Sequence, residues 1–403
     1  MPVQRYAVVG GGIIGTAVAR RLLAQQPDAV VTVLEKEDRL AAHQTGRNSG
    51  VVHAGLYYEP GSLKATLCRR GVSLLREFCA EHGLPYEEIG KVLVALDAAE
   101  EKRLAAIAER ARANGVPGVR VIDRAELHEL EPHVAGIAAL HSPTTAIVDY
   151  VAVTEQLAAD ARAAGATIRT GFEVAGLRST GGEVVTSASG EEVVVDRVVL
   201  CAGLHVDRLA RLAGDDDAPR IVPFRGEYYA LTPDKRALVN GLVYPVPDPR
   251  YPFLGVHLTP RVDGEVLVGP NAVLALAREG YRWRDVSPAE LAAIARFPGF
   301  RRFARQHWRT GLAEMRGSLS KRAYTAAARR YVPELTVEDM VPATAGIRAQ
   351  ALESDGSLVD DFRVTRRGAV VAVRNAPSPA ATSSLAIAEH LVDVLLAEEG
   401  AVS

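Results

Sequence analysis

A glycine-rich turn between two apolar runs constrains the fold of this chain more than any other feature. Residues 6–9 form a short apolar run that ends in the turn Gly10-Gly11-Gly12-Ile13-Ile14-Gly15, and residues 30–34 form a second apolar run. Between them, apolar residues recur at the spacing of one helix face. This order predicts strand, turn, helix and strand, and parallel strands joined in this way take a right-handed crossover.

The turn has the GxGxxG spacing of a dinucleotide-binding fingerprint, with Gly10, Gly12 and Gly15 at its glycine positions. Such glycines allow a sharp turn, a close approach of backbone to a pyrophosphate and tight packing of helix on strand. The N–H groups of the first helical turn would favour the anion. Glu35 closes the second strand 20 residues after Gly15, so we predict that it accepts hydrogen bonds from ribose hydroxyls and disfavours a 2′-phosphate. A glycine turn without a ligand is the alternative.

FAD and NAD both fit this fingerprint, and the rest of the chain favours FAD. Only one complete GxGxxG is present, so we expect no separate NAD domain, and electrons would come from the substrate itself. Residues 198–203 read Val-Val-Leu-Cys-Ala-Gly, which predicts a buried strand running into a small-residue turn. Many flavoproteins with two dinucleotide-type domains use this pattern beside the cofactor, so Ala202 and Gly203 are candidate contacts.

The length of the chain predicts two domains. Its 403 residues, 48% hydrophobic and 24% charged, exceed the usual limit of one core and have a globular composition. The patterns predict helices at residues 74–82, 100–114, 151–164 and 382–398, and strands at residues 91–96, 165–169, 193–200, 227–231 and 265–268. We expect an α/β fold, with a Rossmann-like FAD-binding domain and a second α+β substrate domain built on a largely antiparallel sheet. The FAD-binding domain would comprise residues 1–85, 145–215 and 335–403, and the substrate-binding domain residues 86–144 and 216–334.

Charge and cysteine content argue against several classes of partner. A net charge of -2 and the lack of any block of like charges argue against nucleic acid. Cys68, Cys79 and Cys201 match no metal-ligand spacing, so we predict no metal site and three small buried side chains in a reducing compartment. The start MPVQRYAVVG shows no leader, and no run of 18 uncharged apolar residues occurs. We therefore expect a cytoplasmic protein, and a peripheral contact with the inner face of a membrane stays open.

Four passages carry a resemblance that covers nearly the whole chain. They are residues 47–65, RNSGVVHAGLYYEPGSLKA; residues 223–229, PFRGEYY; residues 244–259, YPVPDPRYPFLGVHLT; and residues 375–382, NAPSPAAT. Together they resemble the L-2-hydroxyglutarate oxidase/dehydrogenase family, which is part of the larger group of D-amino-acid-oxidase-like FAD oxidoreductases. The resemblance implies oxidation of L-2-hydroxyglutarate to 2-oxoglutarate, with FAD taking the hydride and electrons passing to oxygen or a quinone-linked acceptor. Arg374 departs from the apolar or small residue expected before the last passage, which leaves the charge of the pocket open.

Oxidation of an alcohol beside a carboxylate requires a base and cations that hold the carboxylate. His53 is the candidate base, because imidazole titrates near neutrality and His53 follows the segment Asn48-Ser49-Gly50, which is expected to face the flavin. A core histidine, a hydrogen-bond partner of the flavin and a covalent histidyl-flavin link are the alternatives. Arg348 is the first candidate for the substrate carboxylate, because a guanidinium binds a planar carboxylate with two parallel hydrogen bonds.

The distal carboxylate of such a substrate has further candidate ligands, namely Arg225, His257 and Tyr57, followed by Lys64. For each of these four, a structural salt bridge or a core hydrogen bond is an equal alternative. A second anchored carboxylate would separate a five-carbon diacid from lactate or glycolate. The remaining tyrosines of these passages are expected to pack: Tyr58, Tyr228, Tyr229 and Tyr251.

Contacts to FAD are expected along the fingerprint and the flavin-facing segments. If the start of the last helix, near residues 380–382, points at the flavin pyrimidine, its dipole would stabilise the anionic reduced ring, and a plain helix cap is the alternative. The predicted contacts are Gly10, Gly12, Ile13, Ile14, Gly15, Glu35, Lys36, Thr45, Arg47, Asn48, Ser49, Gly50, Val174, Ala202, Gly203, Gly346, Ser378, Pro379 and Ala380.

Other functions on the same scaffold remain open. One is FAD-dependent oxidation of another small 2-hydroxy acid, an amino acid or glycerol 3-phosphate, although no cluster of Lys and Arg near one loop supports a phosphate ester. Another is a flavin-bound sensor without turnover.

Overall fold

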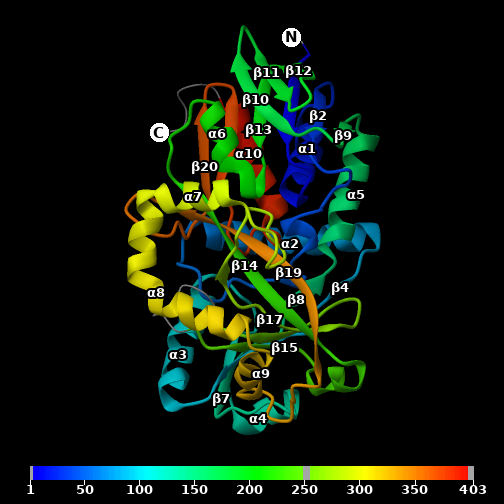
Figure 1. The fold of residues 1–403 in the computed structure, drawn as a ribbon. Coiled ribbons are helices and arrows are strands. Elements are labelled where there is room, and N and C mark those ends of the chain that lie inside the picture. The colour runs from blue at the N-terminus through cyan, green and yellow to red at the C-terminus, as the bar shows by residue number, and fades with distance from the viewer. Residues whose placement is uncertain (1–2, 248–254, 398–403) are drawn as a thin grey trace.

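Two large sheets organise the protein (Figure 1). The computed structural model describes residues 3–247 and 255–397. One sheet has six strands in the order β20-β21-β13-β1-β2-β9, and every pairing in it is parallel except that of β20 with β21. Its strands are β1 (Arg5–Val9), β2 (Val30–Leu34), β9 (Thr167–Arg169), β13 (Arg197–Leu200), β20 (Arg363–Arg367) and β21 (Val370–Asn375).

Both faces of this sheet are covered. Tyr6 and Val8 of β1 face a core built with four helices, whereas Ala7 and Val9 face a second core on the opposite side. The helices of the first core are α1 (Ile13–Gln25), α2 (Leu63–His82), α5 (Tyr150–Ala163) and α10 (Ser384–Leu396). The second core includes α6 (Val206–Leu212) and an antiparallel sheet of β10 (Val174–Ser179), β11 (Glu183–Ser187) and β12 (Glu192–Val195). Burial on both faces explains the continuous apolar runs of β1 and β13.

The second large sheet has nine strands and is antiparallel apart from the pairing of β5 with β15. The long strands β14 and β19 pair along their length and cross the middle of the molecule (Figure 1). The strands are β5 (Lys91–Ala95), β6 (Arg120–Asp123), β7 (Ala138–Ser142), β14 (Arg220–Leu231), β15 (Leu242–Pro245), β16 (His257–Pro260), β17 (Val266–Gly269), β18 (Val273–Leu274) and β19 (Met340–Leu352).

The other described elements are short or lie outside the two sheets. A small sheet contains β3 (Val51–Val52), β8 (Ala146–Val148) and β4 (Tyr86–Glu87). The other helices are α3 (Ala98–Ala113), α4 (Arg124–Leu130), α7 (Pro288–Arg296), α8 (Pro298–Ser318) and α9 (Lys321–Arg329), with 3-10 turns η1 (Gln44–Gly46), η2 (Gly203–His205) and η3 (Pro233–Leu238). Within the part of the chain that the structure describes, no helix is long and apolar enough to cross a membrane.

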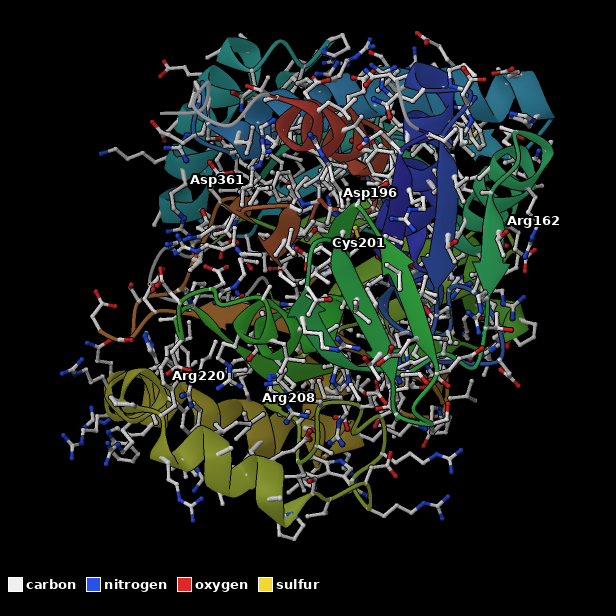
Figure 2. The ribbon with its side chains drawn as sticks, turned by 90° about the horizontal axis from the view of Figure 1, so that it is seen from above. Arg162, Asp196, Cys201, Arg208, Arg220 and Asp361 are labelled. Carbon is white, nitrogen blue, oxygen red and sulfur yellow. The ribbon has the colours of Figure 1, made fainter. Side chains whose placement is uncertain are left out.

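The predicted fold class is confirmed: an α/β arrangement with a mostly parallel sheet and a largely antiparallel second sheet. The division into two domains remains a prediction. The predicted FAD-binding domain includes residues 335–403. Strand β19 lies in that range, yet it pairs with β14 in the nine-stranded sheet. All three cysteines are free thiols; Cys68 and Cys79 are buried, and Cys201, which follows the end of β13 and is labelled in Figure 2, is partly buried.

Four predicted elements differ clearly from those observed, and one of them, the strand predicted at 227–231, begins earlier, at Arg220 of β14. The run 193–200 is two strands, β12 and β13, because Asp196 interrupts it and accepts a hydrogen bond from the Arg5 backbone N–H at 2.8 Å. The helix predicted at 74–82 begins at Leu63, where the Ser62 side chain caps it by accepting from the Ala65 N–H. The last helix begins at Ser384 rather than at residue 382, and its predicted end at residue 398 lies outside the described residues.

The glycine turn should not tolerate a side chain at Gly15. A Cβ there would lie 1.9 Å from the Gly10 carbonyl oxygen, so Gly15→Ala should lower the free energy of unfolding by about 1–3 kcal/mol or more. Gly311→Ala in α8 is the matched control, because its Cβ would meet nothing within 4 Å, and it should stabilise the protein by about 0.5–1 kcal/mol. Urea unfolding of both variants checks this, and a Gly15→Ala protein as stable as the wild type would contradict the close contact.

Candidate active site

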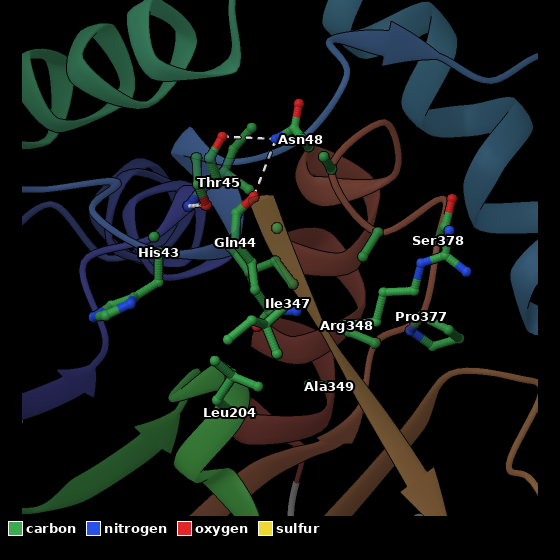
Figure 3. Close-up of a pocket in the computed structure, with 18 of the residues that line it drawn as sticks. His43, Gln44, Thr45, Asn48, Leu204, Ile347, Arg348, Ala349, Pro377 and Ser378 are labelled. Atoms are coloured by element: carbon green, nitrogen blue, oxygen red, sulfur yellow. Dashed lines mark hydrogen bonds between the residues drawn. The ribbon is translucent and has the colours of Figure 1, made fainter. Parts of the chain in front are cut away.

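A cavity of about 1190 Å³ is lined by residues from both large sheets. Its walls come from the glycine turn, the segment 41–49, the end of β13, strand β19 and the segment 373–382. In Figure 3, β19 with Ile347 and Arg348 passes between the segment that carries Thr45 and Asn48 and the segment that carries Pro377 and Ser378. Residues far apart in the sequence therefore meet in one cavity.

The glycine turn opens into this cavity at the start of α1. Gly10, Gly12, Ile13 and Ile14 line it. Gly10 has a φ of 113°, and a Cβ there would lie 2.4 Å from the Cys201 carbonyl oxygen, so only glycine fits. Gly15 does not line the cavity, and its role is to let α1 approach the turn.

The start of α1 suits the pyrophosphate of a dinucleotide. Its N-cap residue, Gly12, has no side chain to cap the helix, and the first turn carries no acidic residue. The positive end of the helix is therefore not neutralised by its own side chains. The Ile13 N–H donates to Thr45 Oγ1 at 3.1 Å, which holds the segment 41–49 against this end. The residues present thus fit the phosphate groups of FAD.

Glu35 is buried at the end of β2 and lines the same cavity. Its Oε2 accepts from the Gly11 N–H at 2.6 Å, and its Oε1 accepts from the Glu37 N–H at 2.9 Å. The carboxylate therefore braces the glycine turn as well as facing the cavity. Its contact with a ribose stays a prediction.

Asn48 shapes the segment that was expected to face the flavin. Its Nδ2 donates to the Thr45 and Gln44 carbonyls at 2.6 and 3.2 Å (Figure 3), and its Oδ1 accepts from the Gly50 N–H at 2.8 Å. Asn48 lines the cavity, whereas Gly50 does not. Gly50 has a φ of 78° and supplies the bend that leads into β3.

A charged network beside Lys36 was missed by the sequence reasoning. Lys36 forms ion pairs with Glu37 and, at 2.7 Å, with Glu279, while His205 Nε2 lies 3.0 Å from Glu279. Burial raises the pKa of Glu279, but hydrogen bonds from His205 and Lys36 lower it to about 2 overall. His43 lies 2.8 Å from Glu37, so three possible metal ligands are close together. The Lys36 ammonium already forms ion pairs with both the Glu37 and the Glu279 carboxylates, so we propose no metal at this cluster.

His53 lies directly after β3, and its imidazole lines the cavity. Its Nε2 lies 3.3 Å from Ser378 Oγ, and its backbone N–H donates to Thr382 Oγ1 at 3.0 Å. Burial, followed by the charge of Lys91, lowers the pKa of His53 to about 3. The imidazole is therefore neutral near pH 7 and has a nitrogen that can accept a proton.

His257 faces the cavity from β16. Its Nδ1 donates to the Gly255 carbonyl at 2.9 Å, which leaves Nε2 as an acceptor in the neutral ring. The Tyr244 ring stacks on it with centroids 3.9 Å apart. Burial is the main reason that the pKa of His257 is lowered to about 3.

Lys91 is a buried cation that the sequence reasoning did not select. It is 2% exposed, and its Nζ donates to Tyr57 Oη at 2.9 Å and lies 3.7 Å from the centroid of the Tyr244 ring. Burial lowers the pKa of Lys91 to about 7. The available signal was a lysine at the start of the predicted strand 91–96, whose other residues are apolar; the structure buries all of β5, where a charge is unusual.

The three other predicted cations have different surroundings. Arg348 lines the cavity from β19, as expected for a carboxylate ligand. Lys64 also lines it but donates to Asp360 Oδ1 at 2.9 Å. Arg225 does not line the cavity: it pairs with Glu227 at 3.1 Å and stacks on Trp283. Residues two apart on a strand share a face, so the buried Arg225 and the partly buried Glu227 form a structural pair instead.

Arg374, the departure noted in the sequence, is also a structural pair. It is 1% exposed, and its Nη1 donates to Asp215 Oδ2 at 2.6 Å. Its Nη2 donates to the Pro219 carbonyl at 2.8 Å. Its charge is thus neutralised within the fold, although part of the residue borders the cavity.

Most predicted site residues line this one cavity. Of the predicted cofactor contacts, all except Gly15 and Gly50 do so, as do His53, Arg348, His257 and Tyr57 among the predicted catalytic residues. Of the tyrosines expected to pack, Tyr229 packs on Tyr324, whereas Tyr58 and Tyr228 border the cavity. Tyr251 lies outside the described residues.

The neutral histidines predict a loss of stability in acid. The pKa values of His53 and His257 are about 3 in the folded state against an ordinary 6.5, so below pH 6.5 the unfolded chain binds protons that the folded chain does not. The free energy of unfolding should therefore fall between pH 6.5 and pH 3, by up to about 1.4 kcal/mol per pH unit for each histidine.

Urea unfolding across this pH range checks the expectation. His257→Gln should make the dependence less steep than in the wild type, whereas His133→Gln, at the more exposed His133, is the control. An equally steep dependence in His257→Gln would contradict a burial-lowered pKa.

Comparisons with known proteins agree with this site. The sequence matches the family model of FAD dependent oxidoreductases over residues 5–394. The mitochondrial L-2-hydroxyglutarate dehydrogenase of Homo sapiens is 46% identical over 404 residues, which cover 96% of this chain and 87% of the relative. The L-2-hydroxyglutarate dehydrogenase of Escherichia coli strain K12 is 44% identical over 388 residues, covering 96% and 92%.

A solved structure gives the same result for the fold. The dithionite-reduced L-alpha-glycerophosphate oxidase from Mycoplasma pneumoniae, with FAD bound, has a TM-score of 0.80 at 25% identity and covers 99% of this chain and 96% of that one. A match of the family model to nearly every residue, together with relatives more than 40% identical, establishes membership. This chain belongs to the FAD dependent oxidoreductases and, among them, to the L-2-hydroxyglutarate dehydrogenase family.

Proposed function

We propose that this protein oxidises L-2-hydroxyglutarate to 2-oxoglutarate in an FAD-dependent reaction. The observation that carries the proposal is the 46% identity to the human L-2-hydroxyglutarate dehydrogenase over 96% of this chain. The cavity supports it with a neutral imidazole, His53, and with Arg348 and Lys64 as cations on its wall. A substrate with two carboxylates suits such a surface.

FAD, when bound, supplies the acceptor for the hydride that leaves the α-carbon of the substrate. In this proposal, His53 accepts the proton of the substrate hydroxyl, and the Ser378 hydroxyl, 3.3 Å from its Nε2, helps to orient the ring. Burial and then positive neighbours such as Lys91 lower the pKa of His53, so the negative charge of a bound substrate would raise the basicity of the imidazole. Arg348 would bind the carboxylate next to the α-carbon with two parallel hydrogen bonds.

The proposed cofactor contacts follow from the same cavity. The start of α1 would hold the pyrophosphate, and Glu35 would accept hydrogen bonds from the ribose. The segment with Asn48 and Ser49 and the segment with Ser378 and Ala380 would flank the isoalloxazine ring, since both line the cavity close to His53.

We also propose that electrons pass to oxygen or to a quinone-linked acceptor. We further propose that the protein is cytoplasmic and contacts the inner face of a membrane peripherally. The support for this contact is α8, on the outside of the molecule (Figure 1). Trp308, Leu312 and Met315 are 55%, 46% and 44% exposed and recur at the spacing of one helix face. Arginines on the same helix, Arg301, Arg305, Arg309 and Arg316, would favour anionic lipid headgroups.

Flotation with vesicles that contain anionic lipid tests the membrane contact. Trp308→Ser combined with Leu312→Ser should reduce the bound fraction several-fold, because apolar area on the helix face is lost. Val194→Ser, at an exposed valine on β12, should leave it unchanged. Failure of the wild type to float with such vesicles would contradict the contact.

Anaerobic mixing of the FAD-loaded protein with a substrate panel tests the proposed function. L-2-hydroxyglutarate should bleach the flavin absorption band, whereas the D enantiomer, L-lactate, glycine and glycerol 3-phosphate should bleach it slowly or not at all. Faster bleaching by one of those compounds would assign the protein to another substrate, and a persistent band with all of them would favour a sensor.

His53→Asn tests the role of the base. It should lower kcat by about 10²–10⁴-fold while FAD stays bound, because the proton acceptor is lost but the glycine turn is intact. His133→Asn is the matched control for histidine replacement. An undiminished kcat in His53→Asn would remove His53 from the mechanism.

A further inference from the structure

Lys91 is placed in the interior by the register of β5. Side chains alternate along a strand, so Val92 and Val94 pack into one core, whereas Leu93 and Ala95 pack into another core that contains Tyr244. Lys91 shares the face of Leu93. Its backbone lies opposite Ser142 of β7 and beside Leu242 of β15, in the middle of the nine-stranded sheet.

The ammonium of Lys91 reaches the rear of the cavity wall. It donates to Tyr57 Oη at 2.9 Å and lies over the Tyr244 ring at 3.7 Å. Tyr57 and Tyr244 both line the cavity. Lys91 is therefore separated from the cavity by two aromatic side chains, one of which it contacts through a hydrogen bond.

The hydrogen bond from Lys91 determines what Tyr57 can do. Because the Tyr57 oxygen accepts from the ammonium, its own hydrogen is left for another acceptor. Among the described residues, none accepts a hydrogen bond from this hydroxyl. Burial raises the pKa of Tyr57, so the hydroxyl remains protonated and able to donate.

No acidic side chain in residues 3–247 and 255–397 forms an ion pair with Lys91. The titratable and charged groups around it are Tyr57, His53, Tyr244 on β15, His257 on β16, Lys64 on α2 and, next to His257, Arg348 on β19. Lys64 is paired with the Asp360 carboxylate, and the other groups are neutral or positive. A buried cation without a carboxylate is costly in the empty protein, and an anion in the cavity would relieve that cost.

We propose that Tyr57 and Lys91 form the subsite for the distal carboxylate of the substrate, with the Tyr57 hydroxyl donating to the carboxylate and Lys91 acting behind it as a positioning residue. This inference rests on the proposed function, because it assigns the second carboxylate of that substrate. It also explains a preference for a diacid: a monocarboxylate would leave the buried ammonium without a counter-charge.

The subsite has a pH signature. Burial lowers the pKa of Lys91 to about 7 in the free protein, and a bound carboxylate favours the protonated form, so the pKa should rise in the complex. Above pH 7, binding of the diacid should therefore take up a proton, and the KM should rise with pH. A monocarboxylate that does not reach this subsite should show neither effect.

Lys91→Met in the FAD-loaded protein tests the assignment, with Lys102→Met on the exposed side of α3 as the matched charge control. Lys91→Met should raise the KM for L-2-hydroxyglutarate by about 30-fold or more, with a smaller change in kcat. Its preference for that diacid over L-2-hydroxybutyrate should fall by a similar factor. The Kd of glutarate, followed by perturbation of the flavin spectrum, should rise in parallel, and Lys102→Met should change none of these values.

Tyr57→Phe is the second variant, and it keeps the test decisive if Lys91→Met does not fold. It should raise the KM for the diacid while leaving that for L-2-hydroxybutyrate within about twofold, since only one hydrogen bond to the distal group is lost. If either variant binds FAD and keeps the wild-type preference for the diacid, the subsite is overturned while the proposed function stands. If the wild-type flavin is not reduced by L-2-hydroxyglutarate, both fall.

Discussion

The close approach of β19 to the segment after β2 holds the two sides of the cavity together. A Cβ at Gly346 would lie 2.3 Å from the Arg47 carbonyl oxygen, so only a glycine lets the nine-stranded sheet come this near to the nucleotide-binding segment. Arg348 follows two residues later on the same strand. The position of Arg348, the proposed carboxylate ligand, relative to the segment that is expected to face the flavin therefore depends on a residue without a side chain.

The electrostatics of the cavity differ between its parts. Around Lys36, each cation has an acidic partner in Glu37 or Glu279, and the network is neutralised within the protein. Around His53 and Lys91, burial keeps the imidazoles neutral, and no acidic side chain among the described residues pairs with Lys91. The first region is neutralised by its own side chains, whereas in our proposal the second would gain stability when an anion binds.

The nucleotide-binding part of the site was readable from the sequence because its signals are local. Gly10, Gly12, Gly15 and Glu35 lie within one strand-turn-helix-strand unit, so their spacing alone predicts their arrangement. The passage around His53 depended on a resemblance and not on spacing. In the structure, His53 lies beside Ser378, a residue more than three hundred positions away. No periodicity in the sequence predicts such a contact.

The substrate side was less readable because it depends on strand register and on burial. Arg225 was a candidate ligand by its residue type, yet its pairing with Glu227 on β14 places it away from the cavity. Lys91 was passed over because an apolar strand with one lysine at its start reads equally well as a strand with an exposed end. The run 193–200 was predicted as one strand for a similar reason, because the effect of Asp196 depends on a distant residue. Asp196 interrupts the strand where it binds the Arg5 backbone N–H.

The long ladder between β14, 12 residues long, and β19, 13 residues long, has one register shift, between Glu227 and Tyr229, and it limits how the enzyme can exchange substrate and product. Rotation of one half of the molecule against the other about a hinge would have to bend or break this ladder, since it reaches from the nine-stranded sheet up to the six-stranded one. Entry of substrate and release of product are therefore expected to depend on movements of loops and side chains at the rim of the cavity. The two large sheets are expected to stay rigid during turnover.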